Sequence, residues 1–484
     1  MGMTANEAFR IGAVGIALTG TLYVASRFSG GASTDGRALV RGGGDASAAA
    51  PASAAPTKPA GAAIWERTFV ASGAGGGARL AGVAATRAGE VLMAGSFTGA
   101  INLGGATLES AGEDDVFVAK LDREGKHVWS HRFGGPGHQN ATGVAVTEDG
   151  EVVVAGTIDQ RADFGGGVLQ SAGMIDVFCL RLDANGGHLW SRRFGDDQEQ
   201  EAGAVAVDRE GNVLLAGSYE GKIDFGSGPI ESAGHDDIFV AKLDRAGKEL
   251  WSRRYGDAGQ QKARAIAAAR DGGVIVTGTF RGDLAIGKTT LASPDADALH
   301  VFALDASGAP RWARASKGAA ASVLDPRGVT VDGDGAITVA ASLRGSVELA
   351  GATIDDRGGE GAALLARFDA SGAPAWATRL GEGRPIEVAG LVATREGDVV
   401  VVTSPLGVLE ARPRGETDGV TVVRFDRKGH VSTTQRLGPE PAAALGVTLD
   451  PAGRVLLGGS SRTPIDVLAG PLAGLTAVVI ELRR

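Results

Sequence analysis

The regular spacing of the tryptophans constrains the fold of this chain more than any other feature. Trp65, Trp129, Trp190, Trp251, Trp312 and Trp376 are separated by 64, 61, 61, 61 and 64 residues. Ser432 takes the equivalent place 56 residues after the last of them, in the segment GHVSTTQRLG. Because self-similarity at a fixed period indicates a repeat architecture, the sequence predicts seven structural units over residues 61–484. We expect the tryptophans to be packing residues of the repeat, with a ligand-stacking surface as the alternative.

Each unit contains four short apolar runs, which we interpret as strands. Examples are GVAVT (143–147), EVVVAGT (151–157), DVFVAKLD (115–122) and HVWSHRFG (127–134). The runs are rich in β-branched and aromatic residues and often alternate, which is a strand pattern. Segments such as TEDGE (147–151) and DREGK (122–126) join them, and their glycine supplies the left-handed position of a tight turn. We therefore expect four antiparallel strands per unit.

Seven such units favour an all-β, seven-bladed β-propeller, because radial closure buries each sheet between two neighbours. A linear β-solenoid is the alternative, although its coils usually have shorter periods. The chain begins the repeat at 62–69 with a fourth run and ends at 477–484 with a third run. The sequence therefore predicts that the N-terminal strand pairs with the three C-terminal strands and closes the ring. Without that pairing, the last blade would expose a strand edge.

The N-terminal segment differs in composition from the repeat. Residues 11–25 carry no charge and lie between Arg10 and Arg27, but they are too short to cross a hydrocarbon core comfortably. We expect 1–26 to be a signal peptide or a retained signal anchor, and the sequence does not decide between them. Residues 27–60, rich in Gly, Ala, Ser and Pro, are typical of a disordered linker. These features predict an exported protein, either secreted or held at the cell envelope, with membrane contact through the N-terminal segment alone.

Composition excludes several classes of protein. The net charge of −9, from 48 basic and 57 acidic side chains, gives no basic surface of the kind that binds nucleic acid. The single Cys excludes an internal disulfide framework and any cysteine-cluster metal site. We expect a monomer.

The repeat resembles that of seven-bladed-propeller (SBBP) repeat proteins of bacterial envelopes. The shared pattern is an alternating run like AVAVD (204–208), then GNVLLAGS (211–218), then a long loop ending in DDIFVAKLD (236–244), then GKELWSRRYG (247–256). The resemblance covers about 420 residues and is weaker from residue 328 onward. It implies a propeller and, for many members, an exported protein of undefined role. It names no catalytic residues.

A second, weaker resemblance concerns VFALDASGAPRW (301–312), which is similar to the Trp-docking repeat of quinone-type propellers. Those proteins include quinone dehydrogenases and outer-membrane assembly scaffolds. The turn here is one residue shorter, and the vicinal Cys pair of some dehydrogenases cannot form from a single Cys. The dehydrogenase reading is therefore disfavoured, and a scaffold remains open.

Known catalytic patterns are missing from the sequence. The seven histidines include His127 and His131, but on a strand their spacing of about 13 Å is too large to share a metal. Asp332 and Asp334 resemble part of a calcium loop that lacks its remaining carboxylates. No Ser/His/Asp array or phosphate-binding loop is recognisable. We therefore predict no catalytic residue, no metal site and no cofactor.

On a propeller, function resides in the loops that a rigid ring carries. The loops from second to third run and from fourth run to the next unit lie at the same end, which we call the loop-bearing end. Acidic residues gather in these loops: Asp114, Asp115, Asp196, Asp197, Glu199, Asp236 and Asp237. They are either a contact surface for a cation-dependent or basic partner, or solvated acidic caps.

Three functions follow as hypotheses. The first is a non-catalytic envelope scaffold that binds a protein or glycan at the loop-bearing end. The second is a hydrolase or lyase with a site in the axial channel, which requires His, Arg, Asp or Glu side chains converging from several blades. The third is a purely structural surface protein.

Overall fold

The computed structural model describes residues 63–318, 322–356, 361–381, 386–405, 419–437, 443–461 and 476–482. All of them belong to the unit Gly61–Arg484. The predicted signal or anchor segment 1–26 and the linker 27–60 lie outside the described residues. Across these ranges the regular elements are β-strands, and we find no helix with the length and apolarity needed to traverse a bilayer.

Five separate sheets each contain four antiparallel strands. In chain order they are β6 (Gln139–Val146), β7 (Val152–Ile158), β10 (Asp176–Leu182) and β11 (His188–Phe194); then β12 (Gln200–Val207), β13 (Val213–Tyr219), β16 (Asp237–Leu243) and β17 (Glu249–Tyr255). The third sheet has β18 (Gln261–Ala268), β19 (Val274–Ile286), β20 (Thr289–Leu304) and β21 (Pro310–Ala315). The fourth has β23 (Val323–Val331), β24 (Ile337–Arg344), β27 (Ala362–Phe368) and β28 (Pro374–Leu380), and the fifth has β29 (Ile386–Ala393), β30 (Val399–Pro405), β31 (Val420–Phe425) and β32 (Val431–Leu437).

A larger sheet of eight strands joins the two ends of the repeat through one long strand, β1 (Ala63–Ala85). Its first part pairs antiparallel with β35 (Thr476–Leu482), from Ala63↔Leu482 to Val70↔Thr476. β35 in turn follows β33 (Ala443–Leu449) and β34 (Val455–Ser461). The second part of β1 pairs with β2 (Val91–Asn102) from Ala71 onward, with a register shift between Ser72 and Gly77. β2 leads to β3 (Thr107–Glu109), β4 (Asp115–Leu121) and β5 (His127–Phe133).

Several loops between the second and third strands contain a short additional hairpin. They are β8 (Arg161–Asp163) with β9 (Val168–Gln170), β14 (Lys222–Ile223) with β15 (Ile230–Glu231), and β25 (Ser346–Leu349) with β26 (Ala352–Asp355), to which β22 (Lys317–Gly318) adds. The similar segments ADFGGGVLQ (162–170) and IDFGSGPIE (223–231) predict the hairpins after β7 and β13.

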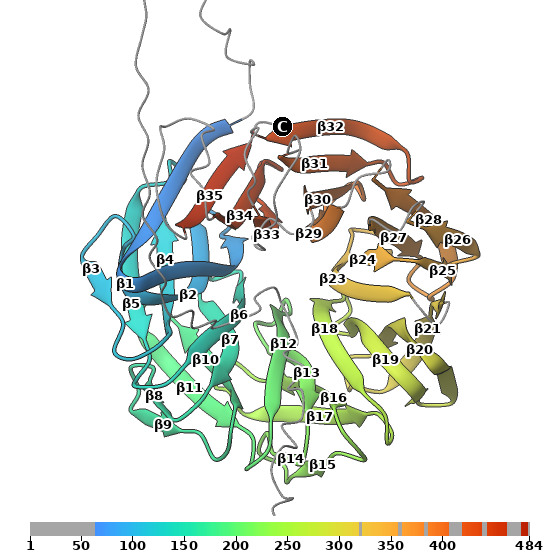
Figure 1. The fold of residues 1–484 in the computed structure, drawn as a ribbon, viewed down its shortest axis with the longest axis horizontal. Coiled ribbons are helices and arrows are strands. Elements are labelled where there is room, and N and C mark those ends of the chain that lie inside the picture. The colour runs from blue at the N-terminus through green and yellow to red at the C-terminus, as the bar shows by residue number, and fades with distance from the viewer. Residues whose placement is uncertain are drawn as a thin grey trace, which may run out of the picture. The chain divides into compact units, whose positions relative to one another are not determined.

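The innermost strands contact one another in series (Figure 1). β1 touches β6, and the contacts continue through β12, β18, β23, β29 and β33, which touches β1. Figure 1 shows the sheets of this unit placed around a common centre, each with its first strand nearest to it. The sequence prediction of an all-β chain built from four-stranded antiparallel sheets is confirmed, and the arrangement is that of a β-propeller repeat protein.

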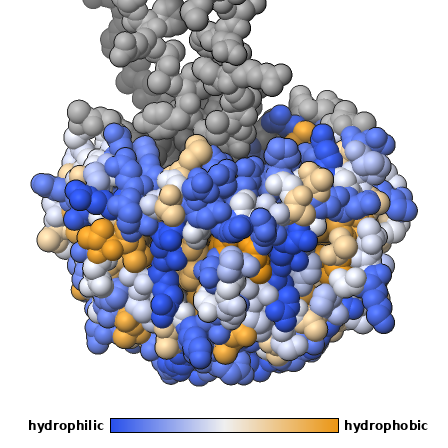
Figure 2. Space-filling model, turned by 90° about the horizontal axis from the view of Figure 1, so that it is seen from below, coloured by the Kyte–Doolittle hydropathy of each residue, from blue (hydrophilic) through white to orange (hydrophobic). Residues whose placement is uncertain are grey.

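The apolar core lies between neighbouring sheets. The central strands β4, β7, β10, β13 and β16 are almost entirely buried, because both of their faces meet another sheet. One cluster, for example, joins Leu92 and Val118 of one sheet to Val154 and Leu180 of the next. Burying each such side chain contributes about 1.5–3 kcal/mol. The rim in Figure 2 is mainly hydrophilic, with separate apolar patches.

Candidate functional site

The tryptophans fix each sheet to the next one. Each indole Nε1 donates a hydrogen bond to a backbone carbonyl in the third-to-fourth-strand turn of the following sheet. The acceptors are Arg123 for Trp65 (3.0 Å), Ala184 for Trp129 (3.3 Å), Arg245 for Trp190 (2.8 Å), Ala306 for Trp251 (3.0 Å), Ala370 for Trp312 (3.2 Å) and Arg427 for Trp376 (3.0 Å). The turn glycine lies against the ring; a Cβ on Gly247, whose φ is 76°, would lie 2.9 Å from Trp190. In this geometry the indole rings pack between neighbouring sheets.

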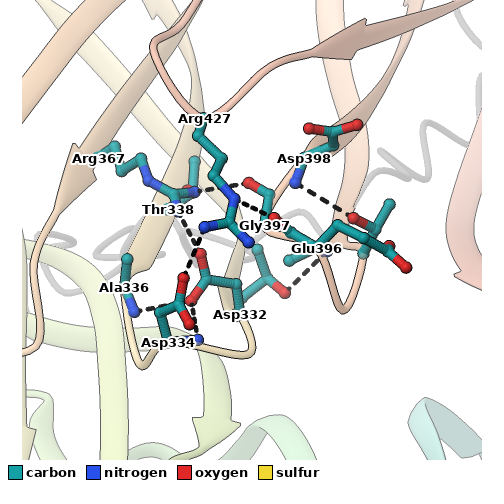
Figure 3. Close-up of polar contacts among 12 residues, drawn as sticks. Asp332, Asp334, Ala336, Thr338, Arg367, Glu396, Gly397, Asp398 and Arg427 are labelled. Carbon is teal, nitrogen blue, oxygen red and sulfur yellow. Dashed lines mark hydrogen bonds and ion pairs between the residues drawn. The ribbon is translucent and has the colours of Figure 1, made fainter.

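A second repeated network also joins neighbouring sheets at the tight-turn end, which is the end opposite the loop-bearing end. Figure 3 shows one copy: the buried Arg367 pairs with Asp332 and donates to the carbonyl of Gly397 in the next sheet (3.3 Å). Asp332 also accepts from the backbone N–H groups of Asp334 (2.8 Å) and Ala336 (2.9 Å). The DGDG segment that resembles part of a calcium loop is therefore a turn that holds an arginine.

Lysine or arginine occupies the same place in three earlier sheets. Lys120 pairs with Glu90 and Lys242 with Asp208, at 2.7 and 2.9 Å, and Arg181 pairs with Glu151. Lys242 also donates to the carbonyl of Gly272 in the following sheet (3.1 Å). Because the arrangement repeats with the fold, we assign it to the cohesion of the sheets.

Asp115 and Asp237, two of the acidic residues that the sequence singles out, have fully buried carboxylates. Each pairs at 2.6 Å with an arginine of the adjacent outer strand, Arg132 or Arg254. Each also accepts a backbone N–H bond of 2.8 Å from its own loop. Burial raises the pKa of Asp237, against the effect of these hydrogen bonds. Both carboxylates are thus engaged inside their sheets, and the same pair recurs at Asp176.

Asp196, Asp197 and Glu199 lie together in the loop before β12. Asp196 accepts hydrogen bonds from Gln200 Nε2 (2.6 Å) and from the backbone N–H of Lys222 (2.7 Å), so it shapes the loop. Asp197 is exposed and Glu199 is half-buried. A contact role for this group stays a prediction.

Asp114 and Asp236 immediately precede the buried aspartates, and their side chains point the other way because alternate residues of an extended chain face opposite sides. Asp114 accepts from Thr98 Oγ1 (2.5 Å) and contacts His138 Nδ1 (3.0 Å). Asp236 lies 3.1 Å from Lys262 Nζ, on the innermost strand of the next sheet. The structure thus brings Asp236 into a set of charged residues that the sequence analysis does not identify.

These residues form what we call the inner row, one residue from the start of each innermost strand. Every member faces the Ser or Thr at the same register position of the second strand, as in Glu201↔Ser218 and Lys262↔Thr279. The row consists of Arg79, Asn140, Glu201, Lys262, Asp325, Glu387 and Ala443. It lies at the loop-bearing end, because the innermost strands begin there.

Charges of both signs interact along the inner row. Lys262 Nζ lies 3.9 Å from Glu201 of the preceding sheet. Burial raises the pKa of Glu201, and the nearby charges of Lys262 and Arg264 oppose that rise. Burial and the charge of Arg327 lower the pKa of Arg79, whereas Asp114 acts in the opposite direction. Coulomb coupling therefore links residues of several different sheets.

The inner row could have been found by comparing equivalent positions of the repeat, although no local motif marks it. It supplies Arg, Lys, Asp and Glu, all of which bind charged groups, and of these Lys, Asp and Glu can also exchange protons. Within the described ranges we find no group of three or more His, Cys, Asp or Glu residues placed to hold a metal ion.

Comparisons with known proteins give distant similarities. No family model matches the chain. The chain is 25% identical over 205 residues to the regulatory protein FlaEY of Caulobacter vibrioides, covering 41% of this chain and 21% of that protein. It is 24% identical over 199 residues to an uncharacterized WD repeat-containing protein of Acanthamoeba polyphaga mimivirus, covering 34% and 14%. The matches thus span about a fifth or less of each curated relative.

Among solved structures, the β-propeller domain of the trilobed protease from Pyrococcus furiosus aligns with 80% of this chain and 90% of its own length. The TM-score is 0.41 and the identity is 9%.

Proposed function

We propose that residues 61–484 form a closed ring of seven blades. The proposal divides the eight-stranded sheet at β1, so that residues 63–70 complete the blade of β33, β34 and β35 while residues 77–85 begin the blade of β2, β4 and β5. These two blades add to the five separate four-stranded sheets. The contacts between innermost strands, which return from β33 to β1, support closure.

We further propose that this ring is a non-catalytic interaction scaffold whose binding site is the inner row. One observation carries the proposal. Positions that hold the sheets together recur with the same residue type, as the tryptophan does in six units and the pairs of Asp115, Asp176 and Asp237 do in three consecutive sheets. The inner row instead changes between basic, acidic and neutral residues in an otherwise repetitive chain. Since partly buried charges cost desolvation energy, a role outside folding explains them better.

A protein is the partner that fits best. The described inner row offers charges of both signs rather than aromatic rings, which favours a peptide segment that carries both signs over a neutral glycan. We also propose that the protein is exported, with residues 1–26 as signal peptide or anchor and 27–60 as tether, on the strength of the sequence alone.

The test compares three forms of the full chain in capture from cell-envelope extracts. The inner-row variant carries Glu201→Gln, Lys262→Met and Asp325→Asn. The control carries Asp149→Asn and Arg245→Gln, an exposed pair at the tight-turn end. We expect a saturable protein partner that the inner-row variant loses at least tenfold and the control retains. Equal capture by all three forms would refute the binding site.

The same variants address the alternative of a hydrolase or lyase. Turnover of an ester, lactone or glycan substrate by the natural chain, abolished by Glu201→Gln alone, would replace the scaffold by an enzyme. A glycan captured in place of a protein would keep the site and change the class of partner.

A further inference from the structure

Each innermost strand contains a register shift just after its inner-row residue. The shift leaves one residue without a partner on the second strand, as a β-bulge does, and such bulges re-aim a side chain. The bulged residues are Ala81, Thr142, Gly203, Arg264, Arg327, Ala389 and Leu445. Two of these seven positions carry a charge, and the two lie on β18 and β23, which contact each other.

The two bulge arginines are incompletely paired. Arg264 is half-buried and has no hydrogen-bond or ion-pair partner among the residues that the structure describes. Arg327 pairs through one Nη with its neighbour Asp325 at 2.5 Å, while its buried Nε has no hydrogen-bond partner in the described part of the chain. A guanidinium group has five N–H donors, and donors that are buried without acceptors are costly.

The nearby acidic groups do not supply the missing hydrogen-bond acceptors of these two arginines. Asp236 and Glu201 both lie beside Lys262, at 3.1 and 3.9 Å. Glu201 is close enough to Arg264 for their charges to interact, but no ion pair joins the two. Arg79 of β1 is a third arginine, and its guanidinium group is close enough to Arg327 for their charges to interact. The charges of Arg79 and Arg327 therefore repel each other, and an anion between them would relieve that repulsion.

We propose, building on the inner row as binding site, that Arg264 and Arg327 together bind an oxyanion, either a carboxylate or a phosphate that the partner carries. Guanidinium groups are planar forks that match both anions with two parallel hydrogen bonds. The adjacent Lys262, with its acidic partners, then provides the other sign of charge for the flanking part of the same ligand.

The experiment titrates inorganic phosphate and, separately, succinate into the full chain by calorimetry at low ionic strength. Arg264→Gln is the test variant, and Arg123→Gln is the control, since Arg123 is 68% exposed at the tight-turn end. We expect at least one anion to bind the natural chain and the control equally, and to bind Arg264→Gln at least tenfold more weakly. Binding of phosphate alone would identify the oxyanion of the partner as a phosphate, and binding of succinate alone would identify it as a carboxylate.

Thermal unfolding supplies an independent readout. Because a ligand that binds only the folded state raises its stability, the bound anion should raise Tm of the natural chain and leave that of Arg264→Gln unchanged. Failure of both anions to bind, or binding that Arg264→Gln does not weaken, would overturn the oxyanion site. In that event, partner capture that still depends on Glu201, Lys262 and Asp325 would leave the scaffold proposal standing.

Discussion

Replacing Trp65 by Ala tests the closure of the ring directly. Trp65 lies on the part of β1 that pairs with β35, is 7% exposed, and donates its indole N–H to the carbonyl of Arg123 at 3.0 Å. The side chain therefore joins the strands at the end of the chain to the turn between β4 and β5. Removing a buried tryptophan costs about 3–5 kcal/mol, since a cavity remains.

The expected change in melting temperature follows from the size of the unit. Unfolding entropy of about 2.1 cal/mol/K per residue gives roughly 0.9 kcal/mol/K for residues 61–484. A loss of about 4 kcal/mol therefore lowers Tm by about 4 °C. Calorimetry and urea unfolding measure the shift, with Ile64→Ala as the matched control, because Ile64 is the neighbouring residue on the same strand and is 41% exposed.

Deleting residues 61–70 extends the same test. The deletion removes the ladder with β35 and the buried Phe69, and it exposes the edge of β35, so we expect loss of cooperative melting or aggregation. Deleting residues 41–50 is a control of equal length. If Trp65→Ala melts like Ile64→Ala and the 61–70 deletion melts like the natural chain, β1 does not close the ring.

Two further predictions concern a turn and a buried histidine. Gly308→Ala should lower the free energy of unfolding in urea by about 2–5 kcal/mol, because φ is 79° and a Cβ would lie 2.8 Å from Trp251. Gly351→Ala is the control, because Gly351 has a similar φ of 78° but open space around it, and it should cost about 1–2 kcal/mol. Equal costs for the two variants would contradict the packing argument. Burial lowers the pKa of His300 to about 4. The unfolded chain then binds the extra proton between pH 6.5 and 4, so stability falls as pH drops, by about 2 kcal/mol from pH 7 to pH 5. His300→Phe should lose this part of the acid sensitivity, and an unchanged slope would refute it.

The repeating part of the fold is predictable because every unit uses the same residue types for the same packing and turn positions. Trp190 and its counterparts set the period, and the turn glycines that lie against the rings repeat at a fixed distance from them. The apolar runs then become strands with ends within a few residues of those expected; the run 115–122, for instance, is β4 (Asp115–Leu121).

The candidate site was only partly predictable. The sequence groups Asp236 with Asp237, but strand alternation separates them, and one carboxylate enters the sheet while the other meets Lys262. Glu201 and Lys262 cannot be found by a search along the chain, because each sheet contributes a single residue to the inner row and the row exists only after the sheets assemble. Aligning the units on the Ser or Thr of their second strands would have exposed the unequal charges.

β32 carries no tryptophan, so its junction with the next sheet differs from the other junctions. Thr433, and not Ser432 as the sequence spacing predicts, takes the tryptophan place, because it pairs with Arg424 as Trp376 pairs with Arg367. The following sheet has β35 and β1 as its outer strands, and no tight turn connects these two strands, so an indole on β32 would have no turn glycine to cover. Among the described residues, this junction has no indole hydrogen bond. Local opening begins where the fewest contacts must break. The backbone amides of β32 and β33 should therefore exchange with solvent before those at the tryptophan junctions, because this junction is where the sheets separate first.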